Sequence, residues 1–430
     1  MPRHSIKTCG LGLLLSPLSL VCYSENIAAT TWSKLPGEHE IGLRSRYQST
    51  NDDWKQDATA FTTRFTLTSK FDLDDEQQWQ LLLQPNLVMV HEDKFNSIVD
   101  YNQYSRIPDP KGNSLTQGYV KYDNNNNWQF SLGRQILSHD NERHLGGSEF
   151  WQTPQSFDAF TLDYNDQLNW RVLYSYSNKV HRIFGPDSER NLPKSDPRYY
   201  YLKERPVSEW GEHKLDAHLL NVSYKTENNL RFSSYLYLTD NQDLDAVSNQ
   251  TLGIRLTDEF KPERIKYRYT AEFAWQQDAY DNPTKYEAWY NLIEGSIQYR
   301  SHIFQLGQET MSHDDGNGFK TPYGSNHKFQ GWADIFASYS GQKGLRDTYV
   351  GYRGRHKKLR WRAVWHDFRS YGSGLELGQE LDIELAYRYT RKWEFKLVYS
   401  TFDSANTKQA EYKAANFDFS TWFISAAYNI

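Results

Sequence analysis

Apolar and polar side chains alternate residue by residue over stretches of about ten residues in many parts of this chain. Between residues 265 and 276 the odd positions read Ile-Tyr-Tyr-Ala-Phe-Trp and the even positions read Lys-Arg-Thr-Glu-Ala-Gln. Residues 61–71 and 381–390 repeat the pattern. Successive side chains of a strand point to opposite faces, so each stretch predicts a strand with one face suited to lipid and one to water. Such segments have the length that a tilted strand needs to cross a bilayer.

The composition agrees with a sheet protein. Aromatic residues make up 16% of the chain and the mean hydropathy is -0.82, whereas helical cores need more Leu, Met and Ala. After residue 22 there is no run of 18 apolar residues, which excludes a helical membrane span there. The formal net charge of -5 argues against nucleic acid as a partner.

The first residues predict a secretory signal peptide. Arg3 and Lys7 precede an apolar run at residues 11–21, and small or polar residues follow it. We expect a signal peptide at residues 1–24, a short lead-in at 25–37 and a barrel at 38–430. The only cysteines, Cys9 and Cys22, fall within the signal, so a disulfide framework and a Cys-ligated metal site are excluded in the processed chain.

Connections between the expected strands alternate between short and long. Eight short turns, rich in Asp, Asn and Lys, and nine long loops predict an all-β fold: an 18-stranded antiparallel transmembrane β-barrel with short periplasmic turns and long external loops. Residues 333–340 also read as a strand. Because both termini must lie on the periplasmic side, an odd strand number is incompatible with closure, and we expect residues 312–344 to form one long loop in the lumen or over its mouth.

Two stretches resemble the alginate-export family of outer-membrane β-barrels. Residues 319–334 are similar to its T-P-x-x-x-x-H-K-F-x-G-W-A-D block, through Thr321, Pro322, His327, Lys328, Phe329, Gly331, Trp332, Ala333 and Asp334. Residues 133–159 are similar to its G-R-Q…D-N-x-R…W…Q-x-F-D-A run, through Arg134, Asp140, Asn141, Arg143, Trp151, Gln155, Phe157 and Asp158. The chain departs from the pattern at Gln152, where the family usually has Arg, and ends in Ile430 instead of an aromatic residue.

The resemblance implies a porin-like channel of the bacterial outer membrane, surrounded by outer-membrane lipid and inserted by the barrel-assembly machinery. It implies passive passage of an acidic saccharide. It also singles out the two motif segments as loops of functional interest. His327, Lys328 and Trp332 either line a constriction or fasten their loop to the barrel wall.

The water-facing positions of the clearest strands are mainly basic. They carry Arg44, Arg46, Arg64, Lys70, Arg171, Arg231, Arg255, Lys266, Arg268, Arg360, Arg362, Arg388 and Lys396, against Glu40, Glu272, Asp382, Glu384 and Glu394. Positive charge on a low-dielectric wall concentrates anions in a pore. The planar guanidinium of Arg suits carboxylates, such as those of uronates or small organic acids. The alternative is that these charges pair across strands and only keep the lumen wet.

Other chemistry has weaker support. Three His-Asp pairs, at residues 139–140, 313–314 and 366–367, suggest the hypothesis of a hydrolase site. Neighbouring residues on a strand point to opposite faces, however, and no serine nucleophile accompanies these pairs. Asp314, Asp315 and Asn317 either hold a calcium ion or form a solvated turn.

We therefore expect a channel for anionic saccharides or uronate-like acids, not an enzyme and without a cofactor. The alternatives are a porin for other small organic anions or nutrients, a membrane-embedded hydrolase and a secreted carbohydrate-binding β-sandwich.

Overall fold

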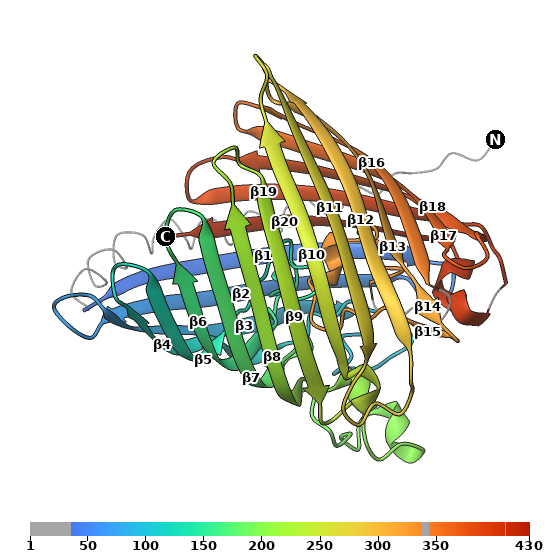
Figure 1. Ribbon diagram of the computed structural model, residues 1–430. Coiled ribbons are helices and arrows are strands. Elements are labelled where there is room, and N and C mark those ends of the chain that lie inside the picture. The colour runs from blue at the N-terminus through green and yellow to red at the C-terminus, as the bar shows by residue number, and fades with distance from the viewer. Residues whose placement is uncertain (1–35, 338–343, 409) are drawn as a thin grey trace.

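The chain forms one closed antiparallel sheet. A computed structural model describes residues 36–337, 344–408 and 410–430. In these residues eighteen strands lie side by side in sequence order, and the first also pairs with the last, which closes the barrel (Figure 1). The predicted fold is thereby confirmed. The signal peptide predicted for residues 1–24, and the lead-in up to residue 35, lie outside the described residues.

The barrel strands are β1 (Glu38–Asp52), β2 (Ala58–Asp72), β3 (Trp79–Lys94), β4 (Gly112–Asp123), β5 (Trp128–Gln135), β6 (Ser156–Asn165), β7 (Trp170–His181), β8 (Glu212–Lys225), β9 (Arg231–Asn241), β10 (Asn249–Phe260), β11 (Ile265–Asp278), β12 (Glu287–Tyr299), β13 (His302–Met311), β16 (Leu345–His356), β17 (Leu359–Ser370), β18 (Glu376–Arg388), β19 (Trp393–Ser404) and β20 (Phe419–Asn429). A separate hairpin consists of β14 (His313–Asp314) and β15 (Asn317–Gly318). The helices are 3-10 turns: η1 (Pro197–Tyr200), η2 (Val207–Glu209), η3 (Asp245–Val247), η4 (Asn326–Lys328) and η5 (Ala410–Asn416). Within the described ranges, none is long and apolar enough to span a membrane.

Short turns at one end of the barrel follow from their side chains. In the β6–β7 turn, the Asp166 carboxylate accepts hydrogen bonds from the backbone N–H groups of Leu168, Asn169 and Trp170. In the β4–β5 turn, the side-chain oxygen of Asn124 accepts hydrogen bonds from three backbone N–H groups, those of Asn126, Asn127 and Trp128. These hydrogen bonds satisfy the backbone N–H groups at the point where the pairing of the two strands ends, because Asp and Asn side chains mimic a backbone turn. The long connections all emerge at the other end, as the alternation of loop lengths predicts.

The outer wall of the barrel is apolar. Ile254 and Ile293 are each 62% exposed, and Phe304 and Leu306 are each 60% exposed. Aromatic pairs follow the short-turn end around the barrel: Trp79–Tyr122, Trp128–Tyr164, Trp170–Tyr224, Phe260–Tyr267 and Trp393–Tyr428. An apolar outer wall with aromatic borders is stable only in lipid, and a closed barrel of this kind is the form that proteins of the bacterial outer membrane take.

Residues 312–344 connect β13 to β16 without adding a barrel strand. Met311 and Leu345, at the two ends of the connection, are paired in register. Ala333–Ala337 has no strand structure, and residues 338–343 lie outside the description. The predicted single long loop is therefore confirmed for its described part.

The apolar core of this barrel lies inside the lumen, between the wall and the loops. One cluster joins the inner faces of β8, β9, β11 and β12 to Leu145, Phe319 and Tyr323 of two loops. A second joins Ala333 and Phe336 to the wall at β17–β19. A third packs Phe95 and Ile107 of the β3–β4 loop against Trp151. Burial of each aromatic side chain contributes about 2 kcal/mol, which holds the loops inside the barrel.

Candidate functional site

The two motif segments of the sequence meet in the lumen. One is the β5–β6 loop (residues 136–155), and the other is the β13–β16 loop (residues 312–344, described to 337). Leu145 and Tyr323 form a parallel bridge, in which Gly146 N donates to Tyr323 O at 2.9 Å. The Gln155 amide donates to Tyr323 O at 2.8 Å. Ser325 N donates to the carbonyl of Glu142 at 2.9 Å. Two stretches far apart in sequence therefore form one structural unit.

Arg143 anchors this unit to the barrel wall. Its guanidinium lies 2.8 Å from the Glu309 carboxylate on β13, with the two side chains 1% and 3% exposed. It also covers the ring of Phe329 at 4.8 Å and reaches Asn326 at 3.5 Å. A single buried cation therefore contacts both loops and the wall, and removing it would leave the buried Glu309 carboxylate with the Tyr290 hydroxyl as a hydrogen-bond donor but without a positive charge.

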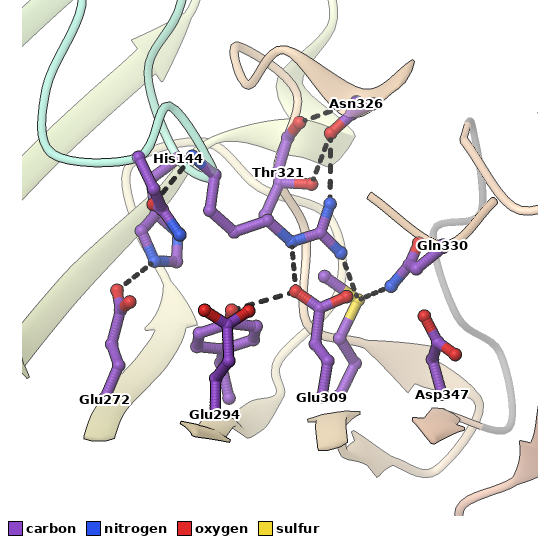
Figure 2. A network of polar contacts seen from close by, with 12 residues as sticks. His144, Glu272, Glu294, Glu309, Thr321, Asn326, Gln330 and Asp347 are labelled. Carbon is purple, nitrogen blue, oxygen red and sulfur yellow. Dashed lines mark hydrogen bonds and ion pairs between the residues drawn. The ribbon is translucent and has the colours of Figure 1, made fainter. Parts of the chain in front are cut away.

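A row of inward carboxylates lies opposite the loops, and two of them, Glu272 and Glu309, bind loop residues. Glu272, Glu294, Glu309 and Asp347 lie on β11, β12, β13 and β16, and Figure 2 shows them opposite Thr321, Asn326 and Gln330. His144 of the β5–β6 loop contacts Glu272 at 3.1 Å. Tyr235 donates to the same carboxylate at 2.8 Å, and Arg255 forms an ion pair with it. The sequence pattern does not predict Glu294, Glu309 and Asp347 as lumen residues, because only the most regular strands show clearly which side chains face inward.

Two cavities lie on either side of this unit. The upper cavity, of about 270 Å³, is lined by Trp54, Lys55, Arg106, Arg182 and Phe184 near the long-loop end. The lower cavity, of about 550 Å³, opens towards the short turns. Its charged lining consists of Arg44, Arg46, Lys328, Arg362 and Lys396 with Glu149, Glu384 and Glu394.

His327 and Trp332 line both cavities, so they stand at the constriction between them. The His327 ring stacks on Phe150 with centroids 3.4 Å apart, and its Nδ1 lies 2.8 Å from Asp334. The guanidinium of Arg362 lies 5.0 Å from the Trp332 ring. These contacts fasten the loop, as one of the two alternatives has it, and the lining of a constriction stays a prediction. Lys328 pairs with Glu142 across the two loops.

Many of the predicted lumen cations have a carboxylate partner. The pairs are Arg46–Asp109, Arg171–Asp163, Arg255–Glu272, Lys266–Glu259, Arg268–Glu259, Arg360–Glu394, Arg388–Glu394 and Lys396–Glu384. Pairing across strands therefore neutralises a large part of the basic face that the alternation predicts.

Arg44, Arg64, Arg231 and Arg362 form no ion pair with any described residue. Arg44 and Arg64 are directly opposed across β1 and β2, which costs stability unless an anion lies between them. Arg44 donates to Gln152 at 3.0 Å and to the carbonyl of Trp151 at 2.6 Å. These bonds hold its guanidinium without neutralising it. Gln152, where the family has Arg, thus binds an arginine of the wall.

The remaining motif residues have structural contacts. Arg134 and Asp158 form a two-point ion pair, which His181 joins at 2.9 Å. Asp158 lies on the opposite face of β6 from Phe157, which packs against Tyr323 in the lumen, so Arg134 is on the outer wall and not in the pathway. Asp140 accepts a hydrogen bond from the Asn221 side chain, and Asn141 accepts one from the backbone N–H of Arg143. Thr321 donates a hydrogen bond to Asn326, and Pro322 lines the upper cavity.

Asp314, Asp315 and Asn317 form the tip of the β14–β15 hairpin. The Asp314 carboxylate accepts from the backbone of Glu287 at 3.2 Å. In the described part of the chain, no three His, Cys, Asp or Glu side chains are grouped so that they could hold a metal ion. Of the His-Asp pairs, His366 contacts Asp347 inside the barrel, whereas Asp367 contacts Arg369 on the other face.

Comparison with known proteins agrees with this architecture. The chain matches no protein-family model and no curated protein sequence. It is similar to solved structures of Pseudomonas aeruginosa OpdK with vanillate (TM-score 0.64, 12% identity, 91% of this chain and 98% of that one). It is also similar to P. aeruginosa OccK2 (OpdF), with TM-score 0.65, 12% identity and coverage of 92% and 97%. Acinetobacter baumannii OccAB2 gives TM-score 0.66, 12% identity and coverage of 91% and 98%. The fold of this chain is therefore that of a porin-like outer-membrane β-barrel.

Proposed function

We propose that the protein is a passive outer-membrane channel for small carboxylate-bearing molecules, with uronate-like acids and short anionic saccharides as the class it fits best. One observation carries the proposal: Arg44 and Arg64 face each other across β1 and β2 beside the lower cavity without a direct ion pair to any described residue, and Glu149 of the β5–β6 loop offsets their two charges only in part. Charge that is held in place but not neutralised attracts anions into a pore.

The constriction adds a second element of selection. The aromatic ring of Trp332 stands beside Arg362, which forms no ion pair with any described residue. A ring-shaped acid can place its apolar face on an aromatic side chain and its carboxylate on a guanidinium. The vanillate bound to the similar OpdK is such an acid. Other small organic anions remain the alternative substrates.

The resemblance to the alginate-export family supports the arrangement of the loops more than the substrate. Most of its motif residues hold the two loops together or fasten them to the wall, as Lys328 and Arg143 do. A long acidic polymer would have to pass the constriction at His327 and Trp332. Short saccharides and single uronates are therefore preferred.

The proposal is tested by ion selectivity. At about 6 Å in water each charge contributes about 0.7 kcal/mol, so the double variant R44Q/R64Q should lower the anion preference about threefold per charge before screening. The reversal potential across a planar bilayer under a potassium chloride gradient measures this ratio, and added glucuronate tests block of the current. The control is R134Q, which removes one arginine charge from the outer wall and is matched by the single variants R44Q and R64Q. A cation-selective wild type, or equal selectivity in R44Q/R64Q and R134Q, would refute the proposal.

A further inference from the structure

Two carboxylates on β18 lie buried at the wall behind the constriction. Glu380 and Asp382 are two residues apart, so they share the inner face of the strand. Their exposed fractions are 1% and 0%. One oxygen of each, Glu380 Oε2 and Asp382 Oδ1, has no hydrogen-bond partner among the described residues. Unsatisfied buried oxygens of this kind are rare in native proteins and call for a physical explanation.

The other oxygens of the pair bind the β13–β16 loop. Ala333 N donates to Glu380 Oε1 at 2.7 Å, and Trp332 N donates to Asp382 Oδ2 at 3.2 Å. Gly331 has φ +81°, and a Cβ there would lie 2.4 Å from the Glu380 carboxylate. Only glycine fits this approach, which explains the Gly-Trp-Ala part of the motif. Trp332 itself lines both cavities, so the pair positions a residue of the constriction.

The surroundings do not supply enough positive charge for two carboxylates. On β17, His366 Nε2 lies 3.6 Å from Asp382, but its Nδ1 is 2.9 Å from Asp347 of β16. Arg362 of β17 faces the Trp332 ring, and Ser400 of β19 donates to Glu380 Oε1 at 2.9 Å. The other charged groups nearby, Glu309 of β13 and Asp334 of the loop, are acidic and pair with Arg143 and His327. Two like charges side by side in a dry site cannot both persist.

We propose that Glu380 and Asp382 share one proton and that this protonated pair is a pH-dependent latch, which positions Trp332 and the constriction. The proton lies between the two oxygens that otherwise have no partner, so each carboxyl group is satisfied. Loss of the proton leaves two charges on the inner wall, and water has to enter to solvate them. That water competes for the backbone N–H groups of Trp332 and Ala333, and the constriction loosens.

The inference rests on the proposed function, since its readout is channel current. Single-channel conductance of the wild type should rise or become noisier as pH increases between about pH 5 and about pH 10, the range in which buried carboxyl pairs can lose a proton. The variant E380Q imitates the protonated pair: its amide oxygen accepts from Ala333 and its amide NH2 donates to Asp382. It should keep the low, quiet conductance at every pH.

Two further variants distinguish positioning from simple damage. E380A/D382A removes the latch and should give the open, noisy current already at low pH. The control E294Q changes an inward carboxylate that binds Gln305 and Tyr349 but no loop backbone, and it should keep the wild-type pH profile. Slower migration of the variants on a gel after boiling verifies that each barrel is folded.

The outcomes separate the two proposals. Absence of any conductance in the folded wild type would refute the channel and not the latch alone. A conducting wild type whose current does not change with pH, or an E380Q variant that keeps the wild-type pH dependence, would overturn the latch and leave the channel intact. Cysteine labelling of A333C gives an independent readout, because the latch predicts faster labelling at high pH and no such increase when E380Q is added.

Discussion

At the scale of single residues, the arginines of the lumen fall into two kinds. Arg46 and Asp109 form an ion pair in which both side chains are almost fully buried, and the guanidinium also contacts the Phe150 ring at 4.7 Å. Arg64 has no ionic partner among the described residues and faces Arg44. The first kind fastens loops to the wall. In the proposed function, the second kind is available to an anion in transit, which would relieve the repulsion between the two arginines.

His139 makes the β5–β6 loop sensitive to acid. Burial, assisted by nearby Arg171 and opposed by Asp163, lowers the pKa of this histidine from 6.5 to about 4. Its Nδ1 lies 3.0 Å from the Tyr237 hydroxyl, and its Nε2 has no partner among the described residues. The released loop binds a proton below about pH 6.5, whereas the packed loop does not until about pH 4. Loop stability is therefore complete above the upper value and falls by up to about 3 kcal/mol as pH decreases through this window.

Hydrogen exchange of the β5–β6 loop at about pH 7 and about pH 4.5 tests this expectation. Protection of the wild-type loop should decrease at the lower pH. In H139Q the side-chain amide can still bind Tyr237 but does not take up a proton in this range, so protection should change little. Equal losses in wild type and H139Q would show that another group senses the acid.

At the scale of elements, the unit formed by the two inward loops depends on Arg143. The variant R143M should weaken loop packing by about 3–5 kcal/mol, because it leaves the buried Glu309 carboxylate without a positively charged partner. The double variant R143M/E309Q should recover most of this loss, since no uncompensated charge remains. Limited proteolysis of the loops in the folded barrel measures both effects.

K328Q is the matched control for R143M. Lys328 is 53% exposed and pairs with Glu142 across the same two loops, so its loss should cost no more than about 1 kcal/mol. If K328Q and R143M expose the loops equally, burial of the Arg143 pair is not what holds them.

The β13–β16 loop should restrict the pore. Replacing residues 313–343 by a short Gly-Ser turn removes His327 and Trp332, which stand between the two cavities. Met311 and Leu345 remain paired, so the wall can stay closed. Single-channel conductance should increase. Unchanged conductance in a folded barrel would mean that ions take another path.

The sequence predicts the wall better than its contents, for a physical reason. Alternation and turn chemistry are local, so Asp166 and residues 265–276 reveal their structure within a few neighbours. The binding of Ala333 to Glu380 joins residues that are far apart in the chain and depends on how the loop folds back. The alternation of faces is also interrupted at bulges, such as the one in the ladder of β6 with β7 between Asp158 and Ala159. Resemblance identifies the motif segments, but the contacts that give them their roles come from the structure.

At the scale of the whole molecule, closure leaves no free strand edge in the barrel sheet. Every barrel strand has a hydrogen-bonded neighbour on both sides, and the apolar side chains face outward. Such a barrel resists detergent, because strand separation must break two full ladders at once. Unboiled protein should therefore migrate faster than boiled protein on a detergent gel. Identical migration, together with solubility in the absence of detergent, would contradict the membrane-barrel structure.

The seam between β1 and β20 has a consequence for biogenesis. Ile41 and Ile430 exchange backbone hydrogen bonds of 2.8 and 3.0 Å. The barrel strand that is synthesised first therefore pairs with the strand that is synthesised last. This contact closes the longest loop in the chain and is the slowest to form by diffusion. The wall elements that receive the inward loops, β9–β13 and β18, are complete before β20 exists. The inner face of the wall and the loops packed against it can thus be assembled while the sheet is still open. Closure of the barrel around these loops is then the last step of maturation.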